Sequence, residues 1–220
     1  MNLATITGRE LWEWRRWAIK IATADAISQR EIDWLLKSVA NLDSLTLRLE
    51  SIEDNRSIEI AMPLDRLSAL WIDRVTNRKP IQYLVGRTFW RDFELVVSPL
   101  VLIPRPETES IIDIAIAASN IAQQQGIWVD LGTGSGAIAI GLAKTLPLAQ
   151  IYAVDTSAAA LEIAKLNATN LNVIDAIDFR QGNWWSSLGH LQGKVAAMLS
   201  NPPYIPSGEV LRLQPEVANH

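Results

Sequence analysis

The chain has 220 residues, of which 49% are hydrophobic and 20% charged, and its mean hydropathy is +0.10. This composition is that of a globular protein and excludes a disordered or low-complexity chain. The absence of cysteine excludes disulfides, thiolate catalysis and cysteine-bound zinc, and two histidines make a histidine-based metal site improbable, so we expect no metal. The net charge of −4 and the pI of about 5.3 disfavour nucleic acid as a direct partner.

Charge is concentrated in the first half of the chain. Residues 1–110 hold 15 of the 20 Lys and Arg residues and 16 of the 24 Asp and Glu residues. The second half is apolar and rich in glycine. This shift in composition predicts two domains.

Residues 1 to about 80 have the pattern of helices. Leu11, Trp14, Ala18 and Ile21 recur at helical spacing, and Ser28-Gln-Arg-Glu31 is a capping box that predicts a helix start. A third amphipathic run spans residues 64–71 and stops before Pro80. The tryptophans in this region also follow helical spacing, which favours packing in a core over an aromatic binding site.

The pattern changes to alternation between residues 86 and 103, which predicts a hairpin-like connector. Pro104-Arg105-Pro106 ends it. Pro106 suits the first turn of a helix, and Glu107 and Glu109 are favoured there by the helix dipole.

Strands and helices alternate from residue 127 onward. The expected strands are 127–130, 151–155, 177–180 and 195–200, and the expected helices are 137–144 and 158–167. This alternation predicts a parallel, doubly wound α/β sheet, in which ligands bind at the carboxyl ends of the strands.

A glycine-rich loop, Asp130-Leu-Gly132-Thr-Gly134-Ser-Gly136, follows the first strand, and Asp155 ends the second strand 25 residues after Asp130. Glycine permits a tight turn and a close approach of backbone to ligand, and a carboxylate at the second strand end can accept both hydroxyls of a ribose. The loop therefore predicts an adenosine cofactor. It leaves NAD and S-adenosyl-L-methionine both open, because a dinucleotide fingerprint also fits these glycines.

A second motif, Ser200-Asn201-Pro202-Pro203-Tyr204, follows the fourth strand. The nitrogen of an amide or a base is a poor nucleophile because its lone pair is delocalised. The Asn201 side-chain oxygen and the Pro202 carbonyl can accept its two N–H bonds, Pro203 stiffens the turn, and Tyr204 offers a flat face for stacking. Catalysis then depends on positioning and electrostatics, and the two motifs together predict methyl transfer from S-adenosyl-L-methionine.

The two motifs resemble those of class I S-adenosylmethionine-dependent amino methyltransferases. Three further stretches narrow the resemblance: Pro80-Ile-Gln-Tyr-Leu-Val-Gly86, Phe89, and Leu102-Ile-Pro-Arg-Pro-Glu-Thr-Glu109. With them the chain looks like the release-factor glutamine methyltransferases, the HemK/PrmC family, over essentially its whole length. The resemblance implies a helical substrate-docking domain at 1–80, a β-hairpin linker at 81–105 and a Rossmann-like catalytic domain at 106–220. It also implies methylation of the glutamine amide in the Gly-Gly-Gln motif of peptide-chain release factors.

The resemblance assigns roles to individual residues. The cofactor's methionine part is assigned to the backbone of Gly132, Thr133, Gly134, Ser135 and Gly136, its ribose to Asp155, and its adenine to Trp184. Asp130 and Asn201 are also assigned to cofactor binding. The glutamine amide is assigned to Asn201, Pro202, Pro203 and Tyr204, of which Asn201, Pro202 and Tyr204 are the catalytic residues. Arg105, Glu107 and Glu109 are expected to border the cofactor and peptide pocket, although a helix-capping turn explains them equally well.

The sequence departs from the family pattern in two places. Phe89-Trp90-Arg91 stands where an aromatic residue followed by glycine is more usual, and the chain stops at His220, before the expected remaining strands and helices. We therefore expect a C-terminally truncated chain with an incomplete sheet and an exposed edge at strand 195–200.

Alternatives stay open at this point. The Asn-Pro-Pro-Tyr motif also serves adenine and guanine amino methyltransferases and glutamine methyltransferases of ribosomal proteins, and a truncated chain could be a non-catalytic binding module. We expect a cytoplasmic monomer that binds neither nucleic acid nor membrane. Its release-factor partner is expected to dock on cations of residues 1–80, namely Arg15, Arg16, Arg30, Arg74, Arg78 and Lys79.

Overall fold

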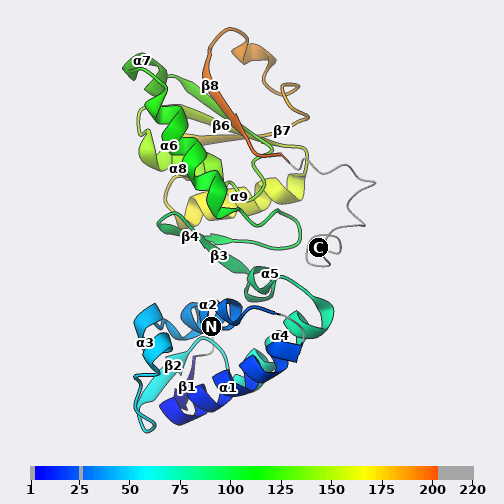
Figure 1. The fold of residues 1–220 in the computed structure, drawn as a ribbon. Helices are drawn as coiled ribbons and strands as arrows, with labels where there is room; N and C mark the ends of the chain where they lie inside the picture. The colour runs from blue at the N-terminus through cyan, green and yellow to red at the C-terminus, as the bar shows by residue number, and fades with distance from the viewer. Residues whose placement is uncertain (1–2, 25–26, 203–220) are drawn as a thin grey trace. The chain divides into compact units, whose positions relative to one another are not determined.

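The computed structural model describes residues 3–24 and 27–202 (Figure 1). The chain forms two compact units, an N-terminal unit that ends at Val85 and a sheet unit that begins at Gly86. No helix among the described residues is long and apolar enough to span a bilayer.

The N-terminal unit is mainly helical. Its elements are β1 (Ala4–Thr7), α1 (Gly8–Ala24), α2 (Gln29–Ala40), α3 (Ser44–Leu49), β2 (Ser57–Ile60), α4 (Leu64–Asn77) and α5 (Ile81–Val85). The capping residue Ser28 precedes α2 as predicted, and its hydroxyl accepts a hydrogen bond from the Arg30 N–H. Helix α4 ends at Asn77 because the next residue, Arg78, adopts a left-handed conformation. Arg78 lies two residues before Pro80.

The apolar faces of α1, α2 and α4 meet in one core. Leu11, Leu35, Leu36 and Trp71 are fully buried there. Each such side chain stabilises the unit by about 1.5–3 kcal/mol. The prediction that these tryptophans pack in the core is confirmed for Trp71, whose indole N–H also donates to the Ala18 carbonyl at 3.1 Å.

Two features of this unit differ from the sequence prediction. Strands β1 and β2 pair antiparallel within the region expected to be helical. Arg15 and Arg74 are buried, so the prediction that they belong to a docking surface is wrong. Arg15 contacts Asp33 and Glu50, each at 2.9 Å, and Arg74 forms two hydrogen bonds with Glu31. Helical spacing does not distinguish an exposed cation from one that is buried with carboxylate partners.

The sheet unit begins with a two-stranded hairpin, β3 (Arg87–Trp90) and β4 (Phe93–Val96), as the alternation predicted. The remaining elements are η1 (Pro106–Thr108), α6 (Glu109–Ala117), α7 (Ile121–Gln124), β5 (Ile127–Leu131), α8 (Ala137–Thr145), β6 (Gln150–Asp155), α9 (Ala158–Asn170), η2 (Ile174–Ala176), β7 (Ile177–Gln181), η3 (Gly189–Leu191) and β8 (Val195–Ser200). All four strands predicted after residue 126 are present, each within one residue of its expected bounds.

These strands form a parallel sheet in the order β7-β6-β5-β8, which confirms the predicted parallel α/β sheet (Figure 1). Residues of α6, α8, α9 and the hairpin pack on one face around Trp128 and Ile151. On the other face, Val129 and Val154 pack against Leu188 and Leu191. In the described part of the chain β8 pairs with β5 alone and lies at an edge of the sheet. The carboxyl ends of β5, β6 and β8 meet at one side of the sheet.

Candidate active site

A cavity of about 370 Å³ lies at these strand ends. Three segments far apart in the sequence line it. Gly132 and Gly134 come from the loop after β5, Asp155 from the end of β6, and Asn201 with Pro202 from the segment after β8. The rest of the lining is Leu100, Val101, Leu102, Val154, Thr156, Ser157, Ala160, Gly182, Asn183 and Trp184. The structure thus brings both predicted motifs to one cavity.

The backbone of the glycine-rich loop adopts conformations that favour glycine. Gly132, Gly134 and Gly136 have φ angles of +73°, +53° and +84°, a region that favours glycine. A Cβ on Gly134 would meet nothing within 4 Å, and one on Gly132 would meet only the Pro202 Cα, at 4.0 Å. The cavity-lining glycines therefore leave open space that side chains would occupy. At Gly136 a Cβ would lie 3.1–3.3 Å from Ala164 and Ile140, so that glycine allows α8 to pack on α9.

The loop's N–H groups are used within the protein. Gly132 and Thr133 both donate to the Val154 carbonyl, at 2.8 and 2.9 Å, and Gly134 donates to Oδ2 of Asp155 at 2.9 Å. These groups hold the loop against the end of β6. The N–H groups of Gly132, Thr133 and Gly134 are therefore not free to donate to a ligand. The sequence could not show this.

Asp155 links the loop to the next helix. While Oδ2 accepts from Gly134, Oδ1 accepts from the Ser157 N–H at 2.9 Å, just before α9. The carboxylate is half-buried and borders the cavity. Each carboxylate oxygen has a second lone pair, so Asp155 can also accept hydrogen bonds from a bound diol.

Asp130, Thr133 and Ser135 belong to the glycine-rich loop but are buried and do not line the cavity. Oδ2 of Asp130 accepts from the Thr133 hydroxyl at 2.6 Å and from the Ala139 N–H at 3.1 Å. Oδ1 has no partner among the described residues. Burial raises the pKa of Asp130 from 3.8 to about 6, although its two hydrogen bonds act in the opposite direction.

Trp184 lines the cavity from the segment that follows the end of β7. Its side chain is 53% exposed and its φ angle is +52°. A bulky residue in the left-handed region is strained, and such strain is concentrated at functional sites. An exposed indole beside a cavity provides a flat apolar surface for a heteroaromatic ring.

Asn201 is half-buried at the cavity, directly after β8. Its side-chain Nδ2 donates to Oγ1 of Thr108, the last residue of η1, at 2.9 Å. Ser200 fixes the end of β8, because its hydroxyl donates to the Leu131 carbonyl at 2.7 Å. Pro203 and Tyr204 lie outside the described residues.

Arg105, Glu107 and Glu109 are not among the residues that line the cavity. The Arg105 carbonyl accepts from the Trp90 indole N–H at 3.0 Å. Glu109 accepts from the Arg91 N–H at 3.0 Å and borders a second, open hollow near the hairpin. Glu107 is exposed. Their contribution to substrate binding stays a prediction.

Sequence reasoning missed Asn167, which is 1% exposed on α9. Its amide contacts both backbone groups of Val96 in the hairpin, accepting from the N–H at 2.7 Å and donating to the carbonyl at 3.0 Å, and it donates to the Ser135 carbonyl at 2.9 Å. One side chain thus joins the hairpin to the glycine-rich loop. A polar residue on the apolar face of a predicted helix was the available signal.

The described residues contain no cluster of three or more His, Cys, Asp or Glu side chains that could hold a metal ion. The arrangement combines a half-open cavity with mainly apolar walls, a carboxylate and a side-chain amide. These groups can bind a nucleoside and orient a planar nitrogen.

Comparison with known proteins gives consistent matches. A family model for the methyltransferase small domain matches residues 112–214. A release factor glutamine methyltransferase from Synechocystis sp. is 48% identical over the whole chain, which spans 74% of that relative's length. Relatives of the same name from Thermosynechococcus vestitus and Gloeobacter violaceus are 44% and 41% identical over 98% and 94% of the chain, and the chain spans 74% and 70% of their lengths.

Proposed function

This chain belongs to the release factor glutamine methyltransferases, and we propose that the cavity at the ends of β5, β6 and β8 is its active site. There a methyl group passes from S-adenosyl-L-methionine to the side-chain amide nitrogen of a glutamine in a peptide-chain release factor, for which we propose the Gly-Gly-Gln motif. The observation that carries this proposal is the meeting of Asp155 and Asn201, from separate motifs, at one cavity.

The residues present fit the cofactor. Gly132 and Gly134 leave unfilled space in the cavity wall, and Asp155 presents to the cavity a carboxylate that can accept hydrogen bonds from a ribose diol. Trp184 offers a surface for the adenine. The buried oxygen of Asp130 belongs to the same loop, so the role we propose for Asp130, Thr133 and Ser135 is to support the loop rather than to touch the ligand.

The bound cofactor supplies an electrophilic methyl group on a sulfonium centre. The protein's task is to hold a poor nucleophile in line with it. Oδ1 of Asn201 and the backbone carbonyl of Pro202 are proposed to accept the two N–H bonds of the glutamine amide, which directs the remaining electron density of the nitrogen at the methyl group. Positioning of this kind accounts for a rate increase without a residue of shifted pKa at the reacting atoms.

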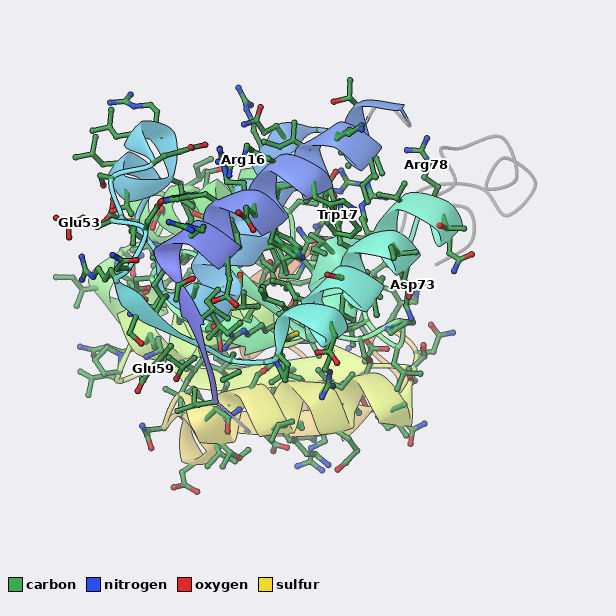
Figure 2. The ribbon with its side chains drawn as sticks, turned by 90° about the horizontal axis from the view of Figure 1, so that it is seen from below. Arg16, Trp17, Glu53, Glu59, Asp73 and Arg78 are labelled. Carbon is green, nitrogen blue, oxygen red and sulfur yellow. The ribbon has the colours of Figure 1, made fainter. Side chains whose placement is uncertain are left out.

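Substrate choice requires a second surface, because glutamine amides occur on nearly every protein. We propose that the N-terminal unit docks the body of the release factor and that the chain acts on it in the cytoplasm, as a monomer, without binding nucleic acid. Arg16 and Arg30 are exposed cations of this unit, and Glu53 and Glu59 are exposed anions. Figure 2 labels Arg16, Glu53 and Glu59. A surface of mixed sign supports orientation of a protein partner rather than attraction to phosphates.

Calorimetric titration with S-adenosyl-L-methionine tests the site. We expect Asp155→Ala to raise the Kd at least tenfold, since each charge-assisted hydrogen bond contributes about 1.5–3 kcal/mol. Asp155→Asn keeps the shape and one acceptor, so its effect should be intermediate. Asp175→Asn, an exposed carboxylate before β7, is the matched control and should leave the Kd unchanged. An unaltered Kd in Asp155→Ala would show that Asp155 does not bind the cofactor.

A further inference from the structure

We propose that Thr108 is a positioning residue for methyl transfer, and that its hydroxyl orients the side-chain amide of Asn201 so that Oδ1 faces the substrate. This inference rests on the proposed function. It adds a residue from the start of α6, which lies outside both sequence motifs and outside the cavity lining.

The contact joins residues 93 positions apart in the sequence. Nδ2 of Asn201 donates to Oγ1 of Thr108 at 2.9 Å, and both residues are half-buried. It is the polar contact that the structure gives the Asn201 side chain within the described residues. Both residues belong to the sheet unit.

The orientation matters because the two ends of an asparagine amide have opposite hydrogen-bonding properties. The nitrogen of the substrate glutamine carries two donors, so it requires an acceptor from Asn201. The terminal torsion of asparagine is broad and roughly two-fold, so rotation by half a turn would place donor against donor. The Thr108 hydroxyl can accept or donate, so it holds the plane of the Asn201 amide. In the orientation that the structure shows, Nδ2 donates to Thr108 and Oδ1 is left for the substrate.

The position of Thr108 is itself fixed by the hairpin. Its N–H donates to the Arg105 carbonyl at 3.0 Å, and that carbonyl also accepts from the Trp90 indole at 3.0 Å. On the other side, Arg91 donates to the Glu109 side chain through its N–H, at 3.0 Å, and to the Glu109 carbonyl through Nη1, at 2.8 Å. Hydrogen bonds therefore hold the segments on both sides of Thr108, and they fix the position at which the Thr108 hydroxyl contacts Asn201.

Arg91 makes these contacts with a φ angle of +53° at the hairpin turn. Glycine adopts this conformation more readily, but it has no guanidinium to bind the start of α6. Two further hydrogen bonds, from Nη1 and Nη2 of Arg91 to Asp113, at 3.1 and 2.9 Å, offset the backbone strain. The unusual residue at the turn therefore contributes to the fixed position of Thr108.

The kinetic test compares Thr108→Val, which keeps the shape and loses the hydroxyl, with Thr108→Ser, which keeps the hydroxyl. We expect Thr108→Val to lower kcat for release-factor methylation by about 10- to 100-fold, the range for loss of one hydrogen bond and misplacement of a positioned group. Thr108→Ser should restore kcat to within about threefold of the original protein, because the hydrogen bond is retained. The Kd for S-adenosyl-L-methionine should stay unchanged in both variants. Ser110→Ala, which removes an exposed hydroxyl two residues later, is the matched control.

A second measurement is independent of turnover. In ¹⁵N–¹H spectra, the side-chain NH₂ signals of Asn201, identified by their loss in Asn201→Ala, should shift in Thr108→Val and stay in place in Thr108→Ser and Ser110→Ala. Unchanged NH₂ signals in Thr108→Val, or an equal fall of kcat in the Val and Ser variants, would overturn the inference. If Asn201→Ala itself methylates at the original rate, the proposed function of the site fails instead.

Discussion

Outside the cavity, Asn167 is the polar residue of the sheet unit whose replacement we expect to lower the stability of the fold most. Replacing Asn167 with Ala removes three hydrogen bonds and leaves the N–H and carbonyl of Val96 and the carbonyl of Ser135 without partners. Asn167 is 1% exposed, so water has little access to its position.

The magnitude follows from the burial of the orphaned groups. An unsatisfied buried backbone group costs about 1–3 kcal/mol. The Ser135 carbonyl belongs to a buried residue, whereas Val96 is half-buried and can recover part of its loss from water. We therefore expect Asn167→Ala to destabilise the sheet unit by about 3–5 kcal/mol, a large part of the about 5–15 kcal/mol of a typical domain.

Hydrogen exchange provides the assay, because it reports on this unit separately from the N-terminal one. The amides of β5 and β6 should lose protection by this amount, and the Val96 amide should lose more than any other hairpin amide. Thr169→Ala removes an exposed hydroxyl from the same helix and should change the free energy by less than about 0.5 kcal/mol. Equal protection in Asn167→Ala and the original protein would refute the coupling between hairpin and loop.

Two further predictions concern the glycine-rich loop. Burial raises the pKa of Asp130 from 3.8 to about 6, so its contribution to stability is fully present below pH 3.8 and is lost as the pH rises through 6. The stability of Asp130→Asn relative to the original protein should therefore increase by about 2–2.5 kcal/mol between pH 4 and pH 7 in urea titrations, and a pH-independent difference would contradict the assignment. Gly136→Ala should lower stability by about 1–3 kcal/mol because of its strained φ and its contact with Ala164. Gly134→Ala should reduce cofactor affinity more than stability because its Cβ projects into open space. Thermal melts measure the loss of stability in the two variants, and calorimetry measures the loss of cofactor affinity.

Local sequence patterns were sufficient to predict the sheet unit. Alternating strands and helices from residue 127 onward place every strand, since buried parallel strands are short apolar runs between turn residues. The N-terminal unit was predicted less well. Its β1–β2 pair joins residues about 50 positions apart, such as Ile6 and Ile58, and local periodicity contains no information on pairing over that distance.

The same distinction holds for the candidate site. Asp155 and Asn201 were predicted because each lies in a contiguous motif at a strand end. Thr108 and Asn167 were missed because their contacts are with segments far away in the sequence: Asn201, 93 residues from Thr108, and Val96 and Ser135, 71 and 32 residues from Asn167. The sequence predicted a close approach of the loop backbone to the ligand, but it could not show that the N–H groups of Gly132, Thr133 and Gly134 donate to Val154 and Asp155. Hydrogen-bond partners of this kind depend on how strands are ordered in the sheet.

We propose that Asn201 holds the glutamine amide at the cavity where Asp155 binds the cofactor. The most direct measurement is mass spectrometry of the release-factor peptide that contains the acceptor glutamine, after incubation with S-adenosyl-L-methionine and either the original protein or Asn201→Ala. The account predicts one added methyl group on that glutamine with the original protein, and a rate at least about 100-fold lower with Asn201→Ala at an unchanged Kd for the cofactor. Methylation by Asn201→Ala at the original rate would contradict it.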